Sequence, residues 1–209
     1  MRNILMAGLA LAMTAGLAGG LAGGAGAADP QTAIFAGGCF WCVESDYDRA
    51  PGVLETISGY TGGTTEHPTY HQVGAGGTGH HEAVEVKFDP EKVSYRQLVD
   101  IFWRTIDPTD DGGQFCDRGE SYKTAVFVAN DEQRAAAEAS KAEAEKALGQ
   151  KIVTPIVDAG PFWPAEDYHQ DYYEKEPMRY NYYRWSCGRN ARIKDLWGDQ
   201  AWAGLSEGH

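Results

Sequence analysis

The chain has few basic residues and a clear excess of acidic ones. Its 209 residues include 18 lysines and arginines against 30 aspartates and glutamates, so its formal net charge at pH 7 is −12. Proteins that bind nucleic acids carry a basic stripe that neutralises phosphates, and this charge balance argues against a nucleic-acid partner. A solvated acidic surface is the simplest interpretation of the excess.

Only one long apolar run occurs, and it lies at the N-terminus behind the single charge of Arg2. The run extends from Ile4 to about Ala28 and ends in small residues, with Ala25 and Ala27 in an A-x-A arrangement. We predict a secretory signal peptide over residues 1–28, cleaved near Ala27 or Ala28, and therefore an exported protein, periplasmic or extracellular. A membrane anchor is the alternative, which the glycines of the run and the lack of a following basic cluster disfavour.

The remainder shows no internal repeat and no linker, and its length suits one domain with a sizeable core. We expect this domain to cover residues 29–198, followed by a loose tail over residues 199–209. Nothing in the sequence requires more than a monomer.

Cysteine is scarce, with four residues at positions 39, 42, 116 and 187. In an exported protein two structural disulfides are the default expectation. A structural zinc site usually shows two close cysteine pairs, whereas only Cys39 and Cys42 are close here, so we expect no metal despite the neighbouring His80-His81-Glu82.

Apolar periodicity and turn residues predict a β-α-β-β-α-β order over the first two thirds of the domain. The strands are predicted at 32–36, 53–60, 82–88 and 122–129, and the helices at 39–49 and from the Ser94–Gln97 capping box to Asp107. This is the ferredoxin-like split order, so we expect an α+β, two-layer sandwich with a mixed sheet.

Outside this core, a long glycine-rich loop is predicted over residues 61–79, and such loops are usually functional. A further helix is predicted from Asn130 to Gly149, then a fifth strand over residues 151–157. Beyond Gly160 we expect an irregular aromatic region with a short helix around residues 165–172.

Cys39 follows Gly37-Gly38 at the predicted junction between a strand and a helix. The free amides and dipole of a helix N-terminus stabilise an anion, which lowers the pKa of a thiol and makes it more reactive. Cys39 is therefore a candidate nucleophile. The alternative is a small buried apolar residue, a common role for free cysteine.

Cys42 completes a C-x-x-C pair, which invites a thioredoxin-like interpretation. Thioredoxin-type pairs usually enclose small residues or proline, however, and here the intervening residues are Phe40 and Trp41. Two adjacent aromatic side chains beside a thiolate suit the wall of an apolar pocket, although either one alone is more often core packing.

Glu82 shares a strand face with Val84, Val86 and Phe88, which is the face expected to enter the core. A carboxylate there is costly unless it is paired or protonated, and burial raises its pKa toward the range of a general acid. The alternative is a frayed strand start with Glu82 at the solvent edge.

Five motifs together resemble the A-type peptide methionine sulfoxide reductases, and they occur in order between Gly37 and about Gly188. They are Gly37-Gly38-Cys39-Phe40-Trp41; Gly59-Tyr60-Thr61-Gly62-Gly63 with His67-Pro68-Thr69-Tyr70; Gly79-His80-His81-Glu82-Ala83-Val84; Asp117-Arg118-Gly119-Glu120-Ser121-Tyr122; and Ala165-Glu166-Asp167-Tyr168-His169-Gln170.

The resemblance implies a role for each matching residue. Cys39 would attack the sulfoxide sulfur, and Phe40 and Trp41 would hold the substrate methyl group. Glu82 would protonate the sulfoxide oxygen. Three further residues would complete the site: Tyr70 and Tyr122 as hydrogen-bond donors to that oxygen, and Asp117 as an ordering group.

The implied activity is reduction of methionine-(S)-sulfoxide, free or in oxidised proteins, and hence protein repair. The product is methionine plus a Cys39 sulfenic acid, which a second thiol converts to a disulfide. An external dithiol such as thioredoxin then reduces this disulfide, and no bound cofactor is required.

The resolving cysteine is less sharply indicated. The resemblance favours Cys187, because many relatives keep a resolving cysteine in this C-terminal region. Cys42 is close in sequence, but positions i and i+3 of one helix need distortion to reach disulfide geometry. Cys116 is a third candidate. At both Cys42 and Cys116 the chain departs from many relatives.

Two other functions compete with this interpretation. A general thiol–disulfide oxidoreductase would use Cys39 and Cys42 and would not turn over a sulfoxide. A disulfide-stapled binding domain would hold two stable disulfides and no reactive thiol.

Overall fold

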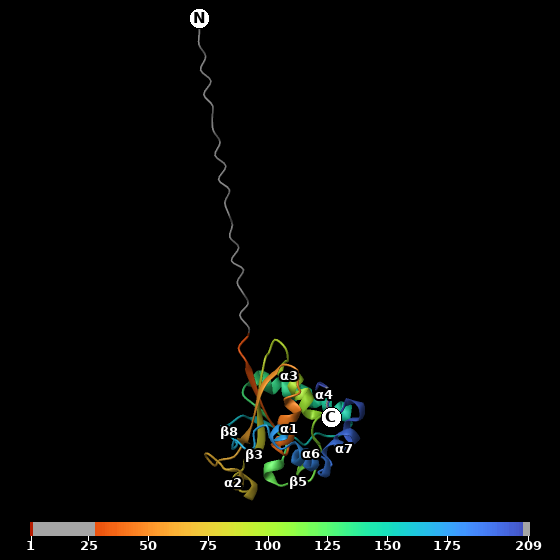
Figure 1. The fold of residues 1–209 in the computed structure, drawn as a ribbon. Coiled ribbons are helices and arrows are strands. Elements are labelled where there is room, and N and C mark those ends of the chain that lie inside the picture. Colours follow the sequence, from red (N-terminus) through yellow and green to blue (C-terminus); the bar gives the residue numbers. More distant parts are fainter. Residues whose placement is uncertain (2–27, 207–209) are drawn as a thin grey trace.

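The computed structural model describes Met1 and residues 28–206, and in the latter range helices pack on a main β-sheet (Figure 1). The predicted signal peptide lies almost entirely outside these described residues. Within them, no helix is long and apolar enough to cross a membrane. The α+β class and the mixed sheet predicted from the sequence are confirmed.

The main sheet has six strands in the order β7-β6-β1-β3-β2-β8. The four central strands are β6 (Ala125–Val128), β1 (Gln31–Ala36), β3 (His81–Phe88) and β2 (Val53–Thr61), and each pairs antiparallel with its neighbour. The edge strand β7 (Ile156–Asp158) runs parallel to β6, and β8 (Trp163–Pro164) pairs antiparallel with β2. A separate two-stranded ribbon joins β4 (Gly113–Gln114) to β5 (Asp117–Arg118).

The helices begin where the sequence supplies capping side chains. Helix α3 (Tyr95–Trp103) starts with the predicted capping box, in which the Ser94 side chain accepts from the Gln97 amide. Helix α4 (Asp131–Leu148) is capped by Asn130 and ends at Gly149, whose φ of 67° is left-handed. Helix α1 (Phe40–Tyr47) leaves β1 through the two glycines before Cys39.

The core lies between the sheet and helices α1 and α3. Phe35 of β1 stacks on Tyr47 of α1 and on Phe102 of α3, with ring centroids 5.0 and 5.1 Å away. Helix α4 packs beside α3, where the Trp103 indole donates to Ser140. The opposite face of the sheet carries a smaller apolar cluster that includes Ala83 and Phe127.

The segment after α4 differs from its prediction as a strand over residues 151–157. Only the last two of these residues belong to β7, because Pro155 interrupts the segment and has no amide to donate to a ladder. The preceding residues still pack, with Ile152 buried and the Val153 amide bonded to the Pro108 carbonyl. The predicted strand over 122–129 is likewise shorter, since Tyr122 ends the 3-10 helix η1 (Glu120–Tyr122).

The prediction of an irregular C-terminal region was wrong. The region contains three helices, α5 (Tyr172–Lys175), α6 (Pro177–Ser186) and α7 (Arg189–Trp197). The predicted helix around 165–172 does not form, because the chain turns through residues 167–171 and Asp171 takes a left-handed φ of 51°.

Residues 199–206, the described part of the segment expected to be a loose tail, return to the domain. The 3-10 helix η2 (Gly198–Gln200) is followed by a segment whose Trp202 amide bonds the Arg104 carbonyl. Leu205 packs on the core, and the Ser206 amide bonds the Arg49 carbonyl.

Candidate active site

A cavity of about 60 Å³ opens where α1 begins. Its walls come from α1, α2 (Tyr70–Ala75), β3, β5, η1 and α6, which are widely separated in the sequence. The lining residues are Cys39, Phe40, Trp41, Tyr70, Glu82, Asp117, Tyr122 and Tyr183. The structure therefore brings together all seven residues predicted as catalytic or substrate-binding, and it adds Tyr183.

Cys39 occupies the N-cap position of α1 with φ −49° and ψ 118°, so it precedes the helical turns. Its carbonyl accepts from the Cys42 amide at 3.1 Å, which starts the helix. The turn needs glycine at Gly38, which has a φ of 83° and where a Cβ would lie 2.5 Å from the Gln114 side chain. The thiol is only 6% exposed.

Glu82 lies next to Tyr60 in the β2–β3 ladder and is 3% exposed, so it is not at a frayed edge. Its Oε2 accepts a hydrogen bond from the Phe40 amide at 3.1 Å. Burial raises the pKa of Glu82 to about 8, with the charge of Asp117 adding to the effect. The carboxyl is therefore largely protonated at neutral pH, as a general acid requires.

The expectation of a lowered pKa at Cys39 was wrong for this resting arrangement. Burial raises the pKa of the Cys39 thiol, and its hydrogen bond with Cys42 and the charges of Cys42 and Glu82 raise it further. The first amide of α1, which could have stabilised a thiolate, is bonded to Glu82 instead.

Cys42 carries the more acidic thiol of the pair. A hydrogen bond from Cys39 lowers the pKa of Cys42 to about 6 against the effect of burial, and the guanidinium groups of Arg189 and Arg184 lower it further. Both arginines are buried and held, Arg184 by an ion pair with Asp46 at 2.9 Å and Arg189 by the Thr105 carbonyl at 2.9 Å. The pair thus carries its proton on Cys39 and its negative charge on Cys42.

Tyr70 and Tyr122 lie beside Glu82 and share a hydrogen bond. Burial and the nearby charges of Glu82 and Cys39 raise the pKa of Tyr70 to about 12, so both phenols remain protonated donors. Tyr70 is placed by Glu166, whose Oε1 accepts from the Tyr70 amide at 2.9 Å. The predicted glycine-rich loop therefore contains a helix start that presents a phenol to the cavity.

Trp41 is held in place by two residues that the sequence did not assign to the site. Its indole stacks on Tyr172 with centroids 3.8 Å apart and donates to His169 Nδ1 at 3.0 Å. The His169 ring also contacts Phe40, with centroids 5.0 Å apart. His169 was visible in a motif but had no chemical pattern of its own.

A second buried carboxyl fixes the segment that carries these two residues. Glu44 of α1 is fully buried, and its Oε2 accepts from the Asp171 amide at 3.1 Å. Burial raises the pKa of Glu44 to about 8. Nothing in the spacing along α1 indicated this role, because the partner lies far along the chain.

Asp117 and Tyr183 close the cavity on the side of α6. The Tyr183 hydroxyl donates to Asp117, and it also lies within hydrogen-bonding reach of Cys39. Tyr183 escaped prediction, although its position four residues before Cys187 places both side chains on one helix face.

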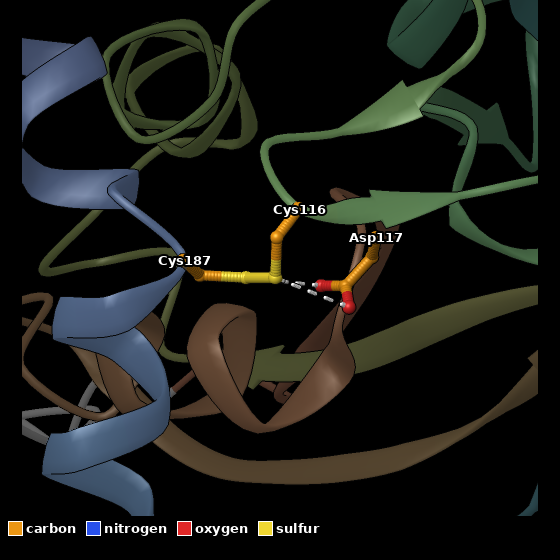
Figure 2. Close-up of side chains that lie close together, drawn as sticks. All are labelled: Cys116, Asp117 and Cys187. Atoms are coloured by element: carbon orange, nitrogen blue, oxygen red, sulfur yellow. Dashed lines mark hydrogen bonds between the residues drawn. A yellow bond between two sulfur atoms is a disulfide. The ribbon is translucent and has the colours of Figure 1, made fainter.

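Cys116 and Cys187 form a disulfide with their Cα atoms 4.9 Å apart, and the Asp117 carboxylate lies against it (Figure 2). Cys39 and Cys42 are free. Cys187, the favoured partner of Cys39, is therefore joined to Cys116 in this structure. Among the described residues, one cluster has the spacing of a metal site, and it consists of Cys116, Asp117 and Cys187. The two sulfurs are bonded to each other, so neither is available as a thiolate ligand.

A buried thiol pair facing a protonated carboxyl, in a cavity with aromatic walls, defines a thiol-based redox enzyme. The family model for peptide methionine sulfoxide reductase matches residues 31–201. The chain therefore belongs to the peptide methionine sulfoxide reductase family and is an oxidoreductase.

Relatives and solved structures agree with this assignment. Peptide methionine sulfoxide reductase MsrA 2 of Rhizobium meliloti is 59% identical over 180 residues, covering 86% of this chain and 90% of the relative. The MsrA of Bacillus licheniformis is 52% identical over 80% of this chain and 94% of its own. Methionine sulfoxide reductase A of Corynebacterium diphtheriae matches with a TM-score of 0.64 at 33% identity, covering 71% of this chain and 76% of that one. The reduced form of Mxr1 from Saccharomyces cerevisiae matches with a TM-score of 0.67 at 30% identity, covering 72% and 87%.

The burial of Glu82 has a measurable effect on stability. The folded protein keeps the Glu82 proton up to about pH 8, whereas the unfolded chain releases it near the ordinary value of 4.5. Between these values the folded state binds more protons, so the free energy of unfolding falls as pH rises, by about 1.4 kcal/mol per pH unit for one group. Because the pKa of Glu44 is raised to a similar value, Glu82→Gln should lessen the wild-type slope by about this amount rather than abolish it, which urea unfolding at pH 5, 6.5 and 8 would show.

Exposed Glu91 provides the matched control, and Glu91→Gln should leave the pH slope of the wild type unchanged. An unaltered slope in Glu82→Gln would mean that Glu82 is ionised in the folded protein at neutral pH.

Proposed function

We propose that the protein reduces methionine-(S)-sulfoxide, free or in oxidised proteins, through a Cys39 sulfenic acid. The observation that carries this proposal is the placement of Cys39 and protonated Glu82 in one cavity, joined through the Phe40 amide. Sulfoxide oxygen is a poor leaving group until it is protonated, so a nucleophile and an acid must act on the same S–O bond.

The side chains of the cavity suggest how the substrate lies. Phe40 and Trp41 form the apolar wall for the substrate methyl group, and Trp41 is fixed by Tyr172 and His169. The sulfoxide oxygen then faces Glu82 and the two phenols, which donate hydrogen bonds to it. Asp117 and Tyr183 order the opposite wall.

The sulfoxide step balances with the protons that the site holds. As Cys39 Sγ attacks the sulfoxide sulfur, its proton passes to the Cys42 thiolate, and Glu82 gives its proton to the oxygen. The S–O bond of the substrate breaks, methionine leaves, and Cys39 carries the hydroxyl as a sulfenic acid. Cys39 is oxidised by two electrons and the substrate sulfur is reduced by two.

We assign the first resolving step to Cys42 rather than to Cys187. Cys39 lies at the N-cap, before the helical turns, and Cys42 at the third helical position, and their two thiols are within hydrogen-bonding reach of each other. The objection to two cysteines within one helix therefore does not apply. Attack by the Cys42 thiol on the sulfenic acid forms the Cys39–Cys42 disulfide and releases water.

A dithiol reductant of the thioredoxin type returns the enzyme to its starting state. Reduction of the Cys39–Cys42 disulfide supplies two electrons and two protons, one of which restores Glu82. No bound cofactor enters this cycle, and its substrates are a small sulfoxide or an oxidised methionine side chain rather than a nucleic acid.

We further propose that the protein is exported and monomeric and has a ferredoxin-like core. Export is supported by the apolar run before residue 28, and it predicts a mature N-terminus near Asp29. The Cys116–Cys187 disulfide suits an oxidising compartment. The ferredoxin-like classification is supported by the antiparallel strand order β6-β1-β3-β2.

The acid role of Glu82 predicts a steep loss of rate on substitution. Glu82→Gln keeps the shape of the side chain but has no proton to give, so we expect single-turnover reduction of an S-epimer peptide to slow by roughly 100-fold or more. The wild-type rate should fall above about pH 8, where Glu82 ionises. Glu91→Gln, which alters an exposed carboxyl outside the cavity, should keep the wild-type rate.

Cys39→Ser should yield no methionine from either epimer. Full activity of Glu82→Gln would remove Glu82 from the acid role, and turnover of the R epimer would contradict the proposed specificity.

The assignment of Cys42 is tested by trapping the first oxidised product. After one equivalent of sulfoxide, wild-type enzyme should contain a Cys39–Cys42 disulfide, identified by mass spectrometry of peptides after alkylation. Cys42→Ser should instead accumulate the Cys39 sulfenic acid, detected with a dimedone-type reagent. A Cys39–Cys187 disulfide in the wild type, formed as fast as methionine, would restore Cys187 to the resolving role.

A further inference from the structure

Arg189, the first residue of α7, is a buried cation without a carboxylate partner among residues 28–206. It is 2% exposed. Its Nη1 and Nη2 donate to the Gly37 and Thr105 carbonyls at 3.2 and 2.9 Å, and its guanidinium lies 4.8 Å from the centre of the Phe115 ring. The Nε–H group has no hydrogen-bond acceptor in this part of the chain. A buried cation is costly unless an anion compensates it, so the fold implies an anion nearby.

The second buried arginine, Arg184, differs because its charge is already matched. Its Nη2 lies 2.9 Å from the Asp46 carboxylate, and its Nη1 donates to the Tyr180 hydroxyl at 2.9 Å. The charge of Asp46 acts on the Cys42 thiol in the opposite sense to that of Arg184 and offsets part of its effect. The positive charge that no ion pair neutralises is therefore the one on Arg189.

The Arg189 guanidinium lies against the turn that carries the thiol pair. It holds the Gly37 carbonyl, two residues before Cys39, and a Cβ added at Gly38 would lie 3.8 Å from its Nη1. Cys42, at the third position of the helix that this turn begins, is 1% exposed. After the hydrogen bond from Cys39 and the effect of burial, the charge of Arg189 has the largest influence on the pKa of Cys42.

Several other charged or titratable groups act on Cys42, and most keep one charge state below about pH 8. They are Cys39 and Asp46 next to or on α1, Glu82 on β3, and Tyr180, Tyr183 and Arg184 on α6. Burial raises the pKa of the Cys39 thiol, of the Glu82 carboxyl and of both phenols, so these groups stay neutral. Asp46 is ion-paired with Arg49 and Arg184. Cys42 is therefore the group of this set whose charge changes near pH 6.

We propose that Arg189 is the counter-ion of the Cys42 thiolate and a positioning residue for proton transfer from Cys39. Its charge keeps Cys42 ionised, so that Cys42 is ready to accept the Cys39 proton when Cys39 attacks the sulfoxide. Arg189 does not line the cavity and acts through Cys42 rather than on the substrate. The role in proton transfer rests on the proposed function, whereas the charge pair does not.

The first test is the pH profile of single-turnover sulfoxide reduction. The wild-type rate should fall on the acid side with a midpoint near the Cys42 pKa of about 6, because protonated Cys42 cannot accept the Cys39 proton. Arg189→Met keeps a long side chain without the charge, so the midpoint should rise by about one pH unit or more. Arg189→Lys keeps the charge and should shift the midpoint much less.

Lys194→Met is the matched control, because it removes an exposed positive charge from the same helix and should keep the wild-type midpoint. An unchanged midpoint in Arg189→Met, or equal shifts in the Met and Lys variants, would overturn the proposal. Each rate is divided by the maximum rate of the same protein, so a variant that folds only in part does not mimic the shift.

The second test needs no catalytic activity. Urea unfolding is measured at pH 7.5 for the wild type, Arg189→Met, Cys42→Ser and the double variant. Arg189→Met should destabilise the wild type more than it destabilises Cys42→Ser, because serine leaves no thiolate for the cation to compensate. At pH 5, where Cys42 is protonated, this difference should shrink.

Equal losses of stability in the two backgrounds at pH 7.5 would contradict the pairing of Arg189 with Cys42. Failure of the proposed function would look different, since the wild type would then form no methionine at any pH. The four unfolding measurements would still report whether the two side chains form a charge pair.

Discussion

The hydrogen bond from the Phe40 amide to the Glu82 carboxyl is the interaction on which the site depends. It joins the first residue of α1 to the start of β3, and so it sets the distance between nucleophile and acid. It also satisfies a buried carboxyl oxygen and a free helix amide in one contact. Because the same burial excludes water, the pKa of Glu82 rises to about 8 and the group keeps a proton at neutral pH.

This arrangement shapes the electrostatics of the thiol pair. With its amide committed to Glu82, the helix start does not activate Cys39 directly, and the negative charge instead lies on Cys42 near two buried guanidinium groups. A neutral Glu82 does not repel the charge that develops on Cys39 during attack. Glu82 and Cys42 thus act together. Glu82 gives its proton to the sulfoxide oxygen, while the Cys42 thiolate takes the proton of the Cys39 thiol.

Much of the site could be predicted because its parts lie in short motifs with chemical meaning, such as Cys39 after two glycines or Glu82 on an apolar strand face. The four central strands and helices α1, α3 and α4 followed from periodicity and capping residues, whereas α2 and the β4–β5 ribbon did not. What could not be predicted depends on contacts between distant segments. The pKa of Cys39 depends on which group takes the helix amide, Tyr183 enters through the packing of α6, and the helices after residue 171 are stabilised by packing rather than by an apolar stripe.

The catalytic cycle depends on a Glu82 that is protonated in the resting enzyme at neutral pH. Difference infrared spectroscopy of wild type against Glu82→Gln at pH 7 measures this directly, through the carbonyl stretch of an un-ionised carboxyl group. A protonated Glu82 should give such a band in the wild type, and the band should be absent from the variant and titrate away near pH 8. A carboxylate band at Glu82 at pH 7, with no un-ionised carbonyl lost on substitution, would contradict it.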